Sequence, residues 1–563
     1  MLERRTAPEL WREAVRNAPA KAAYLEEGPE GWSPVSWDDA TERIDALARG
    51  LLAHGVRHGD AVAVLSRTSV DWILLDWAIM SIGAVVVGLY PTSSAPECQY
   101  VLEHSEAVIA FAEDDDQAHK LVSVRNALPA LREIVPFDLL DKFEAEGRAS
   151  KHLQPDPVEE DDLATLIYTS GTTGPPKGCM LTHKNLVTAA THVRNAMEQE
   201  GDVVLLFLPM AHSYARLAHQ GATHHHATIA AVSDVARVPE ALASVQPAVL
   251  PAVPRVYEKI HANAVGEIER AGGAKRAIGL WAVGVGSKVS RVERAGRKPG
   301  PWLALQHKLA DKLVFAKVRA RLGGKLRLGV SGAAPLAVDV MEFFHAMGVP
   351  VIEGYGLTET ASSATSNDPA DFRIGTVGRP VDDCEIKLDE DGEILIRSDS
   401  IFAGYYKDPE ATAAVLDGDG WFRSGDVGEI DADGFVKITD RKKDLIITAG
   451  GKNIAPQNLE NALKSSRFIS QAIVVGDRRP YVTALLTLDE AEVASSGRDP
   501  QNLAQEVVDD VNRDRVRVEQ IKKFTIIPRE FSLEEGEVTP TLKLRRRVIH
   551  DHFAAEIEQL YAD

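Results

Sequence analysis

The most constraining feature of this 563-residue chain is the alternation of short apolar runs with longer amphipathic stretches through its first two thirds. Apolar runs such as Ala61–Leu65 and Val203–Leu208 are typical of strands that are buried on both faces. The stretches between them, such as Trp37–His54, repeat apolar residues at helical spacing. Because strands that alternate with helices tend to pair in parallel, the pattern predicts an α/β fold with largely parallel sheets.

The same patterns predict further elements along the body of the chain. We expect strands at Leu163–Tyr168 and Leu326–Val330, and helices at Leu181–Met197 and Leu336–Ala346. The very apolar stretch Trp72–Leu89 contains Asp76 and Gly83 and is too short to span a bilayer comfortably, so it indicates a buried helix that runs into a strand. The polar, proline-containing stretch Glu144–Asp162 is typical of a surface linker.

The pattern changes near residue 380. Glu385–Arg397 and Val427–Thr439 each read as two short strands around an Asp-Gly turn, which predicts a small antiparallel β unit. Short strands and helices follow after Asp440, including a hairpin at Ile469–Leu488 and a helix at Leu503–Val516. We therefore expect an N-terminal body over residues 1–439, β-rich from about 380 to 439, and a smaller α+β domain over 440–563.

Composition excludes several classes of protein. The net charge of −20 argues against a general nucleic-acid binder, which needs basic surface to neutralise phosphates. Three widely spaced cysteines, Cys98, Cys179 and Cys384, form no disulfide framework or CxxC metal knuckle and fit a reducing cytoplasm. The charged N-terminus lacks the apolar core of a signal peptide, and no stretch predicts a transmembrane helix.

The segment Leu166–Gly178, LIYTSGTTGPPKG, predicts a phosphate-binding loop. An apolar strand leads into a run of glycines, which let the backbone approach an anion closely, together with hydroxyl donors and the charge of Lys177. The segment differs from a Walker A loop, because two prolines stand before the lysine. A polar surface turn is the simpler alternative.

The segment also resembles the signature of the adenylate-forming superfamily, which contains acyl-CoA synthetases, peptide-synthetase adenylation domains and luciferases. Further motifs follow in the order of that family. They are FLPMAHSYAR (207–216), PAVPRVYEKI (251–260), VSGAAPL (330–336), EGYGLTET (353–360), GWFRSGDVGEID (420–431), DRKKDLIITAGGKNIAP (440–456) and PTLKLRRR (540–547). Within the superfamily, the segments DGWFRSGDVGEIDADGFVKITDRKK (419–443) and TPTLKLRR (539–546) are most similar to those of bacterial long-chain fatty-acid–CoA ligases.

This resemblance implies a body of two α/β subdomains and a β subdomain, followed by a mobile C-terminal lid. It implies ATP, Mg²⁺ and coenzyme A as cofactor and co-substrates, and two half-reactions. A fatty-acid carboxylate attacks the α-phosphorus of ATP to give acyl-AMP and pyrophosphate; the lid then rotates, and the thiol of coenzyme A attacks the acyl-adenylate. The hinge of this rotation would lie near residues 440–443.

The resemblance also assigns roles residue by residue. Glu359 corresponds to the Mg²⁺-binding glutamate, with Ser170 as a second candidate ligand, and Mg²⁺ needs few carboxylates when phosphates and water complete its shell. The catalytic candidates are Lys543, Glu359, Thr172 and His212. The nucleotide and coenzyme A candidates are Thr169, Ser170, Gly171, Thr172, Thr173, Gly174, Lys177, Gly332, Ala333, Ala334, Glu353, Gly354, Tyr355, Gly356, Leu357, Thr358, Asp426, Arg441, Lys443, Gly450, Gly451 and Lys452.

Several of these residues have distinct expected functions. Tyr355 would stack on adenine, Asp426 would accept hydrogen bonds from the ribose hydroxyls, and Lys543 would deliver positive charge to the reacting phosphate. Lys443 is the closest match to the hinge residue, and Gly450–Lys452 would border the pantetheine channel. If the resemblance to the family is set aside, the simpler interpretation of Asp426 and Arg441 is an ordinary ion pair, and that of the KLRRR run is a solvated tail.

The histidines are less informative. His212 matches a residue that closes the acyl-binding entrance in relatives, whereas a histidine at a strand end is otherwise most often structural. His224–His226 departs from relatives, which are more apolar or glycine-rich there, and leaves the shape of the acyl tunnel open. By residue type these histidines could hold zinc, but no cysteine or carboxylate spacing supports it, and we interpret them as surface residues.

The leading hypothesis is therefore an ATP-dependent, AMP-forming ligase for a fatty acid, with a long chain favoured. The alternatives are a ligase for a medium-chain or aryl acid, an acyl-AMP ligase that serves a carrier protein, a P-loop ATPase, and an inactive binding protein. The expected partners are small molecules and no nucleic acid, with a cytoplasmic location that is compatible with transient contact with a membrane surface. Sequence leaves the choice between monomer and homodimer open.

Overall fold

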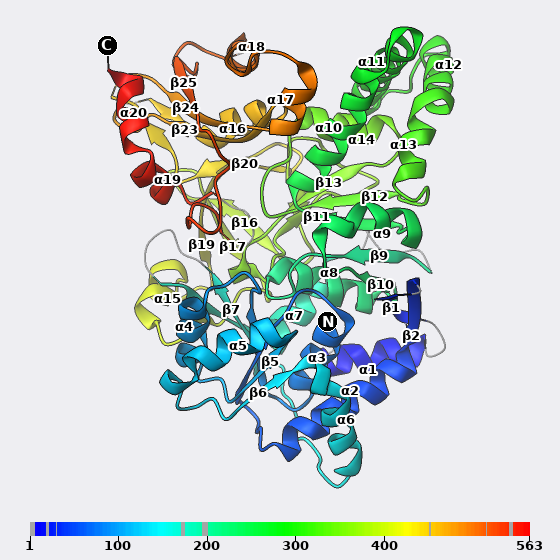
Figure 1. Cartoon of the computed structure of the whole chain (residues 1–563), viewed down its shortest axis with the longest axis vertical. Coiled ribbons are helices and arrows are strands. Elements are labelled where there is room, and N and C mark those ends of the chain that lie inside the picture. Colours follow the sequence, from blue (N-terminus) through cyan, green and yellow to red (C-terminus); the bar gives the residue numbers. More distant parts are fainter. Residues whose placement is uncertain are drawn as a thin grey trace.

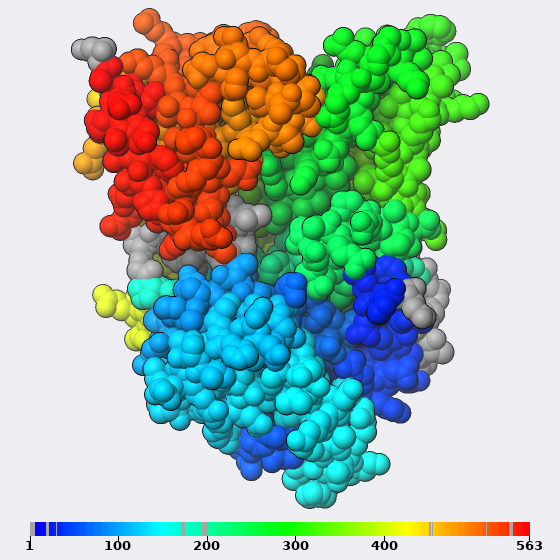
Figure 2. All heavy atoms as spheres, viewed as in Figure 1, coloured from blue at the N-terminus to red at the C-terminus, as the bar shows by residue number. Residues whose placement is uncertain are grey.

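The computed structural model describes residues 6–18, 22–29, 31–169, 175–193, 201–449, 452–513, 515–539 and 544–562. The first part of the chain forms one end of the molecule, and the C-terminal segment sits at the other end beside a pair of long helices (Figure 1). The two ends are separated by a hollowed region in the space-filling view (Figure 2). Two large sheets and a small antiparallel sheet build the body.

A seven-stranded sheet carries the predicted phosphate-loop strand. Its order is β18-β8-β7-β4-β3-β5-β6, in which β7, β4, β3, β5 and β6 are parallel and β8 and β18 are added antiparallel. The bounds are β3 (Ala61–Leu65), β4 (Val85–Leu89), β5 (Ile109–Ala112), β6 (Glu133–Pro136), β7 (Leu163–Thr169), β8 (Lys177–Thr182) and β18 (Gly404–Tyr405). The pairing of β18 with β8 joins segments that lie far apart in the sequence.

A nine-stranded sheet forms the second layer, in the order β15-β14-β13-β12-β11-β9-β10-β1-β2. Its six central strands are parallel; at the edges, β2 pairs antiparallel with β1, β14 with β13, and β15 with β14. The bounds are β1 (Ala22–Gly28), β2 (Gly31–Ser36), β9 (Val203–Leu206), β10 (Thr228–Ala231), β11 (Val249–Ala252), β12 (Leu328–Ser331), β13 (Val351–Tyr355), β14 (Thr365–Ser366) and β15 (Arg379–Pro380).

Helices cover the two sheets, and a core of apolar side chains lies between them. The helix α3 (Val70–Ser81) is buried along almost its whole length and leads into β4, as the sequence predicts. Other helices of the body include α1 (Ala7–Asn17), α2 (Trp37–Ala53), α4 (Ala95–Ser105), α5 (Asp115–Val124), α7 (His183–Thr191), α8 (Ser213–His224), α9 (Val238–Val245), α10 (Pro254–Arg270), α11 (Gly273–Arg294), α12 (Pro301–Ala310) and α14 (Val338–Ala346).

The predicted β-rich region forms a four-stranded antiparallel sheet, in the order β16-β17-β19-β20. Its bounds are β16 (Glu385–Leu388), β17 (Glu393–Arg397), β19 (Phe422–Ile430) and β20 (Val436–Arg441). Both expected hairpins are present, and Gly434 in the second turn has a φ of +84°, which a glycine adopts without strain. This sheet carries two of the predicted site residues toward the C-terminal segment.

The C-terminal segment has apolar cores of its own. Two buried clusters contain only residues from Ile446 onward. They pack around a three-stranded sheet, β23 (Ile469–Val475), β24 (Thr483–Leu488) and β25 (Lys523–Ile526), of which the first two form the expected hairpin. The covering helices are α16 (Pro456–Lys464), α18 (Pro500–Arg513), α19 (Arg546–His552) and α20 (Ala554–Tyr561).

One prediction of local structure holds only in part. Residues 150–162 form the expected irregular and largely exposed linker, but residues 144–149 belong to a helix, α6 (Leu140–Ala149), which packs on α2. The backbone of α2 passes so close to Gly147 that a Cβ there would lie 1.9 Å from the carbonyl oxygen of Ala46. The buried carboxylate of Glu144 accepts hydrogen bonds from Arg43 Nε at 2.8 Å and Arg148 Nη2 at 2.6 Å. Because these ion pairs neutralise the buried carboxylate, a helix with a polar sequence can pack against α2.

A second difference concerns the start of α7, which the sequence places at Leu181. The helix begins at His183, because the hydroxyl of Thr182 caps it by accepting the backbone N–H of Asn185 at 3.2 Å. Leu181 instead belongs to β8. The expected continuation to Met197 runs beyond residue 193 and lies outside the described residues.

Candidate active site

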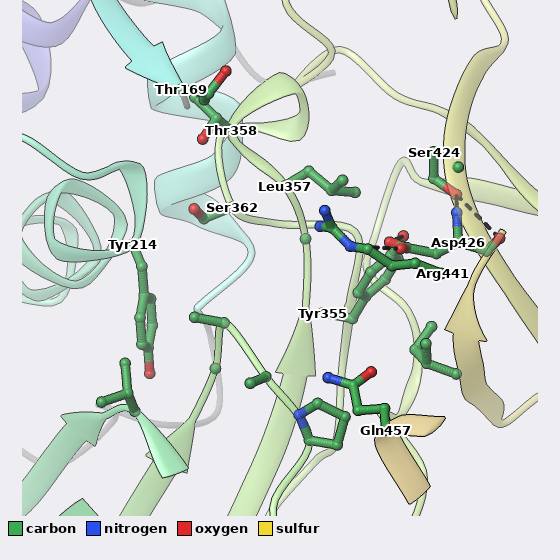
Figure 3. A pocket seen from close by; sticks show the side chains of 18 of the residues that line it. Thr169, Tyr214, Tyr355, Leu357, Thr358, Ser362, Ser424, Asp426, Arg441 and Gln457 are labelled. Carbon is green, nitrogen blue, oxygen red and sulfur yellow. Dashed lines mark hydrogen bonds and ion pairs between the residues drawn. The ribbon is translucent and has the colours of Figure 1, made fainter. Parts of the chain in front are cut away.

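A cleft of about 2020 Å³ lies between the body and the C-terminal segment. The ends of β7, β12 and β13 and the strands β19 and β20 contribute residues to its lining. Thr169, Tyr355, Asp426 and Arg441 are among the lining residues labelled in Figure 3. Most of the predicted site residues that the structure describes line this cleft. They are Thr169, Lys177, His212, Gly332, Ala333, Ala334, Glu353, Gly354, Tyr355, Gly356, Leu357, Thr358, Glu359, Asp426, Arg441 and Lys443.

One side of the cleft holds a chain of three polar side chains. The hydroxyl of Tyr355, at the end of β13, donates to Asp426 Oδ2 at 2.7 Å. Arg441 Nε lies 3.3 Å from the other oxygen, Asp426 Oδ1, because β19 and β20 pair these two residues across the sheet (Figure 3). Asp426 is 4% exposed, so its charge is held by these partners rather than by water. Burial and the neighbouring Asp426 charge raise the pKa of Tyr355, which stays a donor.

Close backbone packing supports this side of the cleft. A Cβ at Gly356 would lie 2.3 Å from the backbone carbonyl carbon of Ser362, so only glycine lets the two segments pass. In the neighbouring loop after β12, Ala333 has a φ of +71°, an uncommon conformation for a residue with a side chain. Such a constrained loop presents its backbone to the cleft beside Tyr355.

The buried carboxylate of Glu353 ties this loop to β13. Its Oε1 accepts the backbone N–H of Leu336 at 2.8 Å. Burial raises the pKa of Glu353 to about 7, and the Leu336 hydrogen bond opposes this rise. Glu353 therefore fixes the relative position of the loop and the strand, and its contact is with protein.

A second group of side chains forms around Glu359. The hydroxyl of Tyr405, on β18, donates to Glu359 Oε1 at 2.7 Å. Lys177 Nζ lies 5.0 Å from the centre of the Tyr405 ring and 3.4 Å from the carboxylate of Asp408. Burial and the Glu359 charge raise the pKa of Tyr405. Tyr405 thus stands between the candidate metal ligand and the lysine that follows the predicted phosphate loop.

The predicted phosphate loop itself is described only at its ends. Thr169 and Lys177 are cleft residues, on β7 and β8. Ser170, Gly171, Thr172, Thr173 and Gly174 lie outside the described residues.

A cluster of hydroxyl groups lies near the loop ends. Ser213 Oγ is 3.4 Å from Thr358 Oγ1 and accepts the hydroxyl of Ser362 at 2.5 Å. Thr358 and Ser362 both line the cleft, as Figure 3 shows. These groups can donate to an anion once they turn away from one another.

His212 stands at the start of α8 and lines the cleft. Its Nδ1 accepts the backbone N–H of Tyr214 at 3.2 Å, so the histidine caps the helix. The hydroxyl of Tyr214 donates to the carbonyl of Val330 at 2.8 Å. Beyond them the cleft is lined by apolar side chains, among them Val193, Leu217, Ala218, Pro251 and Val253.

The three consecutive histidines lie at the C-terminal end of the same helix, α8. His224, His225 and His226 are half-buried rather than exposed, and the rings of His224 and His225 meet edge to face with centres 4.9 Å apart. The interpretation of this stretch as surface is therefore too simple, because all three side chains are partly buried where α8 ends.

The junction to the C-terminal segment follows β20. Burial raises the pKa of Asp440 to about 6, although its oxygens accept the backbone N–H groups of Arg441 at 2.6 Å and Gln457 at 3.3 Å. Lys442 Nζ lies 3.1 Å from Glu393 and also pairs with Asp391, both at the turn between β16 and β17. Lys443 lines the cleft.

One predicted residue that the structure describes is not brought to the cleft. Lys452 is exposed; its backbone pairs with Thr448, and it does not line the cleft. Gly450, Gly451 and Lys543 lie outside the described residues. Thr539 and Leu544, on either side of the undescribed stretch that includes Lys543, line the cleft.

Sequence reasoning missed Tyr405, Ser213 and Gln457. Tyr405 contacts Glu359 only because β18 pairs with β8, and Gln457 reaches Asp440 through the start of α16. No local spacing signals these long-range contacts. Ser213 was within reach, since it follows His212 in a motif already singled out.

The comparisons with known proteins define the class of the molecule. The family model described as AMP-binding enzyme matches residues 11–406, and the model described as AMP-binding enzyme C-terminal domain matches residues 443–563. The chain belongs to the AMP-binding enzyme family.

Individual relatives agree with this assignment. A protein of Mycobacterium bovis named long-chain-fatty-acid–CoA ligase is 39% identical over 94% of this chain and 92% of its own length. A Xenopus laevis protein that is also named long-chain-fatty-acid–CoA ligase is 31% identical over 99% of this chain and 84% of its own length. The adenylation domain of a carboxylate reductase from Mycobacterium chelonae is a structural match, with a TM-score of 0.80, 26% identity and coverage of 99% and 91%.

Proposed function

We propose that this protein activates a fatty acid, with a long chain favoured, through an acyl-AMP intermediate to acyl-CoA. One carboxylate oxygen of the acid forms a bond to the α-phosphorus of ATP, and pyrophosphate leaves. The thiol of coenzyme A then attacks the acyl carbon, its proton is lost to solvent, and AMP leaves with the bridging oxygen. The relatives named long-chain-fatty-acid–CoA ligases support this substrate class.

The observation that carries the proposal is the joint placement of Glu359, Tyr355, Asp426 and Arg441 on one cleft that also has apolar walls. Tyr355 offers a ring for adenine, and Asp426 offers acceptors for ribose hydroxyls, held by Arg441. Lys177, Thr169 and Thr358 stand where the phosphates would approach. Apolar residues beside His212 would take the acyl chain.

Magnesium fits the residues on the other side of the cleft. Glu359 is a carboxylate whose orientation is set by the Tyr405 hydroxyl, and Mg²⁺ prefers few protein carboxylates with phosphate oxygens and water. The bound ion would neutralise charge on the leaving pyrophosphate. Ser170 and Thr172 of the phosphate loop are further proposed contributors.

We propose that residues 440–563 act as a lid that turns about residues 440–443. The described orientation is held by contacts between α10 and the C-terminal segment: Arg467 with Glu269 at 3.0 Å, and Arg270 with Glu492 at 3.0 Å. It places Thr539 and Leu544 on the cleft, which suits delivery of the Lys543 charge in the first half-reaction. A second orientation would bring Gly450–Lys452 to the cleft for coenzyme A.

We further propose that the protein works in the reducing cytoplasm and meets membranes only peripherally. Its three cysteines are free and buried. Among the described helices, none has both the length and the apolar character needed to cross a bilayer.

The function is tested by ATP–pyrophosphate exchange with carboxylic acids from acetate to stearate, together with AMP release in the presence and absence of coenzyme A. The proposal expects exchange with long-chain acids and AMP release that depends on coenzyme A. Exchange with only short or aromatic acids would keep the reaction and reject the substrate. Exchange without any response to coenzyme A would favour an acyl-AMP ligase.

A further inference from the structure

One segment of this acidic protein is strongly basic. Residues 273–327 contain 14 lysines and arginines but only two carboxylates, whereas the whole chain has a net charge of −20. These residues form α11, α12, a π-helical turn at Asp311–Phe315 and α13 (Ala316–Arg321), and they end just before β12. Helices α11 and α12 form a hairpin that projects from the body beside the C-terminal segment (Figures 1 and 2).

The inner face of the hairpin is attached to the body. Ala310 and Phe315 are fully buried, and His307 Nε2 is 2.8 Å from the carbonyl oxygen of Ala346 at the end of α14. This contact fixes which side of α12 faces the protein. The opposite side is therefore presented to the surroundings in a defined orientation.

The outer face of α12 is apolar. Trp302, Leu305 and Leu309 are 70%, 58% and 50% exposed, and they follow one another at intervals of three and four residues, which places them on one helical stripe. Leu313 extends the stripe into the π-helical turn, and Ile278 and Leu280 are exposed on α11. Six of the 15 exposed large apolar residues in the described chain thus fall on this hairpin.

Lysines flank the apolar stripe and are not neutralised. Lys308 and Lys312 lie one helical turn apart on α12 and its π-helical extension, next to Leu305 and Leu309. Arginines nearer the body are paired, such as Arg319 with Asp311 at 2.6 Å. In the part of the chain that the structure describes, no carboxylate lies within 4 Å of the charged groups of Lys275, Arg276, Lys288, Arg297, Lys298, Lys308, Lys312, Lys317 or Lys325.

We propose that the outer face of the α11–α12 hairpin docks on an anionic lipid surface. A stripe with an exposed tryptophan and leucines, bordered by unneutralised lysines, has the composition of helices that lie in the plane of a membrane interface. The apolar side chains enter the acyl boundary, and the lysine ammonium groups reach the lipid phosphates. The charge of the hairpin is opposite to that of the rest of the chain, which turns this face toward the lipid.

The purpose of this docking surface rests on the proposed function, because it would serve an enzyme that acts on a fatty acid. A long-chain acid partitions into bilayers, and docking would hold the cleft close to its source. The helix α10, which contributes Arg255 and Glu258 to the cleft wall, leads directly into α11. The docking itself is measured without any substrate, so the two claims can fail separately.

The test is sedimentation of the full chain with vesicles of phosphatidylcholine alone or mixed with phosphatidylglycerol. Two variants remove one component each: Trp302→Ser/Leu305→Ser removes the apolar contact, and Lys308→Glu/Lys312→Glu reverses the charge. Val516→Ser/Val518→Ser is the matched control, because these valines are exposed on the C-terminal segment. Exchange with soluble octanoate, in the absence of vesicles, checks that each variant is folded and active.

The proposal expects wild-type protein to sediment with the anionic vesicles, and less so as salt rises. Each hairpin variant should lower the partition coefficient about tenfold or more, while the valine control and octanoate exchange stay unchanged. Wild-type protein that stays in the supernatant overturns the proposal, as does equal binding of all variants. A dimer that only the tryptophan variant dissociates, without vesicle binding, would assign the face to a second copy instead. Vesicle binding without any exchange activity would retain the docking surface and reject the fatty-acid function.

Discussion

Replacing Tyr405 with phenylalanine tests the proposed metal side of the cleft. The substitution removes the hydroxyl that donates to Glu359 Oε1 at 2.7 Å and leaves the ring against Phe402, whose centre is 4.9 Å away. A hydrogen bond to a charged group contributes about 1.5–3 kcal/mol. Since Tyr405 is only half-buried, we take the lower end, about 1.5 kcal/mol, which corresponds to about a tenfold change in an equilibrium constant.

The assay is ATP–pyrophosphate exchange as a function of Mg²⁺ concentration. In Tyr405→Phe we expect the Mg²⁺ concentration for half-maximal exchange to rise about tenfold, because the carboxylate of Glu359 is no longer held. In a Glu359→Gln background, the same change should have little further effect, as a double-mutant cycle requires of a direct interaction. Tyr406→Phe is the control, since the Tyr406 ring packs on His104 instead. Unchanged Mg²⁺ dependence in Tyr405→Phe, or an equal shift in the control, would refute the reasoning.

Three further predictions concern stability and the lid. Burial raises the pKa of Glu353 to about 7 from 4.5. The free energy of unfolding of the wild type should therefore exceed that of Glu353→Gln by the largest margin below pH 4.5, and about 3 kcal/mol of this difference should be lost by pH 8. A difference that stays constant with pH in urea titrations would contradict this prediction. Asp76 and Arg216 form a fully buried ion pair at 2.5 Å. Asp76→Ala should lower the free energy of unfolding by about 3–5 kcal/mol, because it leaves a buried charge without its partner, and Asp76→Leu/Arg216→Met should restore that stability. If the double variant does not restore it, the pair contributes more than its charges. Lys442→Ala should loosen the junction and raise the ratio of coenzyme A-dependent turnover to pyrophosphate exchange about twofold to fivefold. The effect is small because the lysine is half-exposed. An unchanged ratio would show that the Glu393 contact does not restrain the lid.

Much of this fold follows from sequence patterns alone. Strands that are apolar throughout, such as Ala61–Leu65, leave little choice of position, and Asp-Gly turns mark both hairpins of the four-stranded sheet. The helix α6 escaped because its polarity is satisfied by ion pairs: Glu144 is buried between Arg43 and Arg148, which a linear pattern does not reveal.

The site divides in the same way. Motif resemblance indicates Tyr355, Asp426 and Arg441, and the structure adds the reason that they meet, which is the register between β19 and β20. Tyr405 could not be predicted, because its contact with Glu359 depends on the pairing of β18 with β8. The basic hairpin is visible as charge in the sequence, but the outward direction of its apolar stripe requires the contact of His307 with α14.

The central claim is that the carboxylate of the fatty acid attacks the α-phosphorus of ATP on this cleft. It is tested most directly with palmitate labelled with oxygen-18 in its carboxylate, with unlabelled ATP, Mg²⁺ and coenzyme A, and mass spectrometry of the products. The account predicts one labelled oxygen in AMP, one in palmitoyl-CoA, and none in pyrophosphate. Label in phosphate or pyrophosphate, or production of ADP instead of AMP, would contradict it.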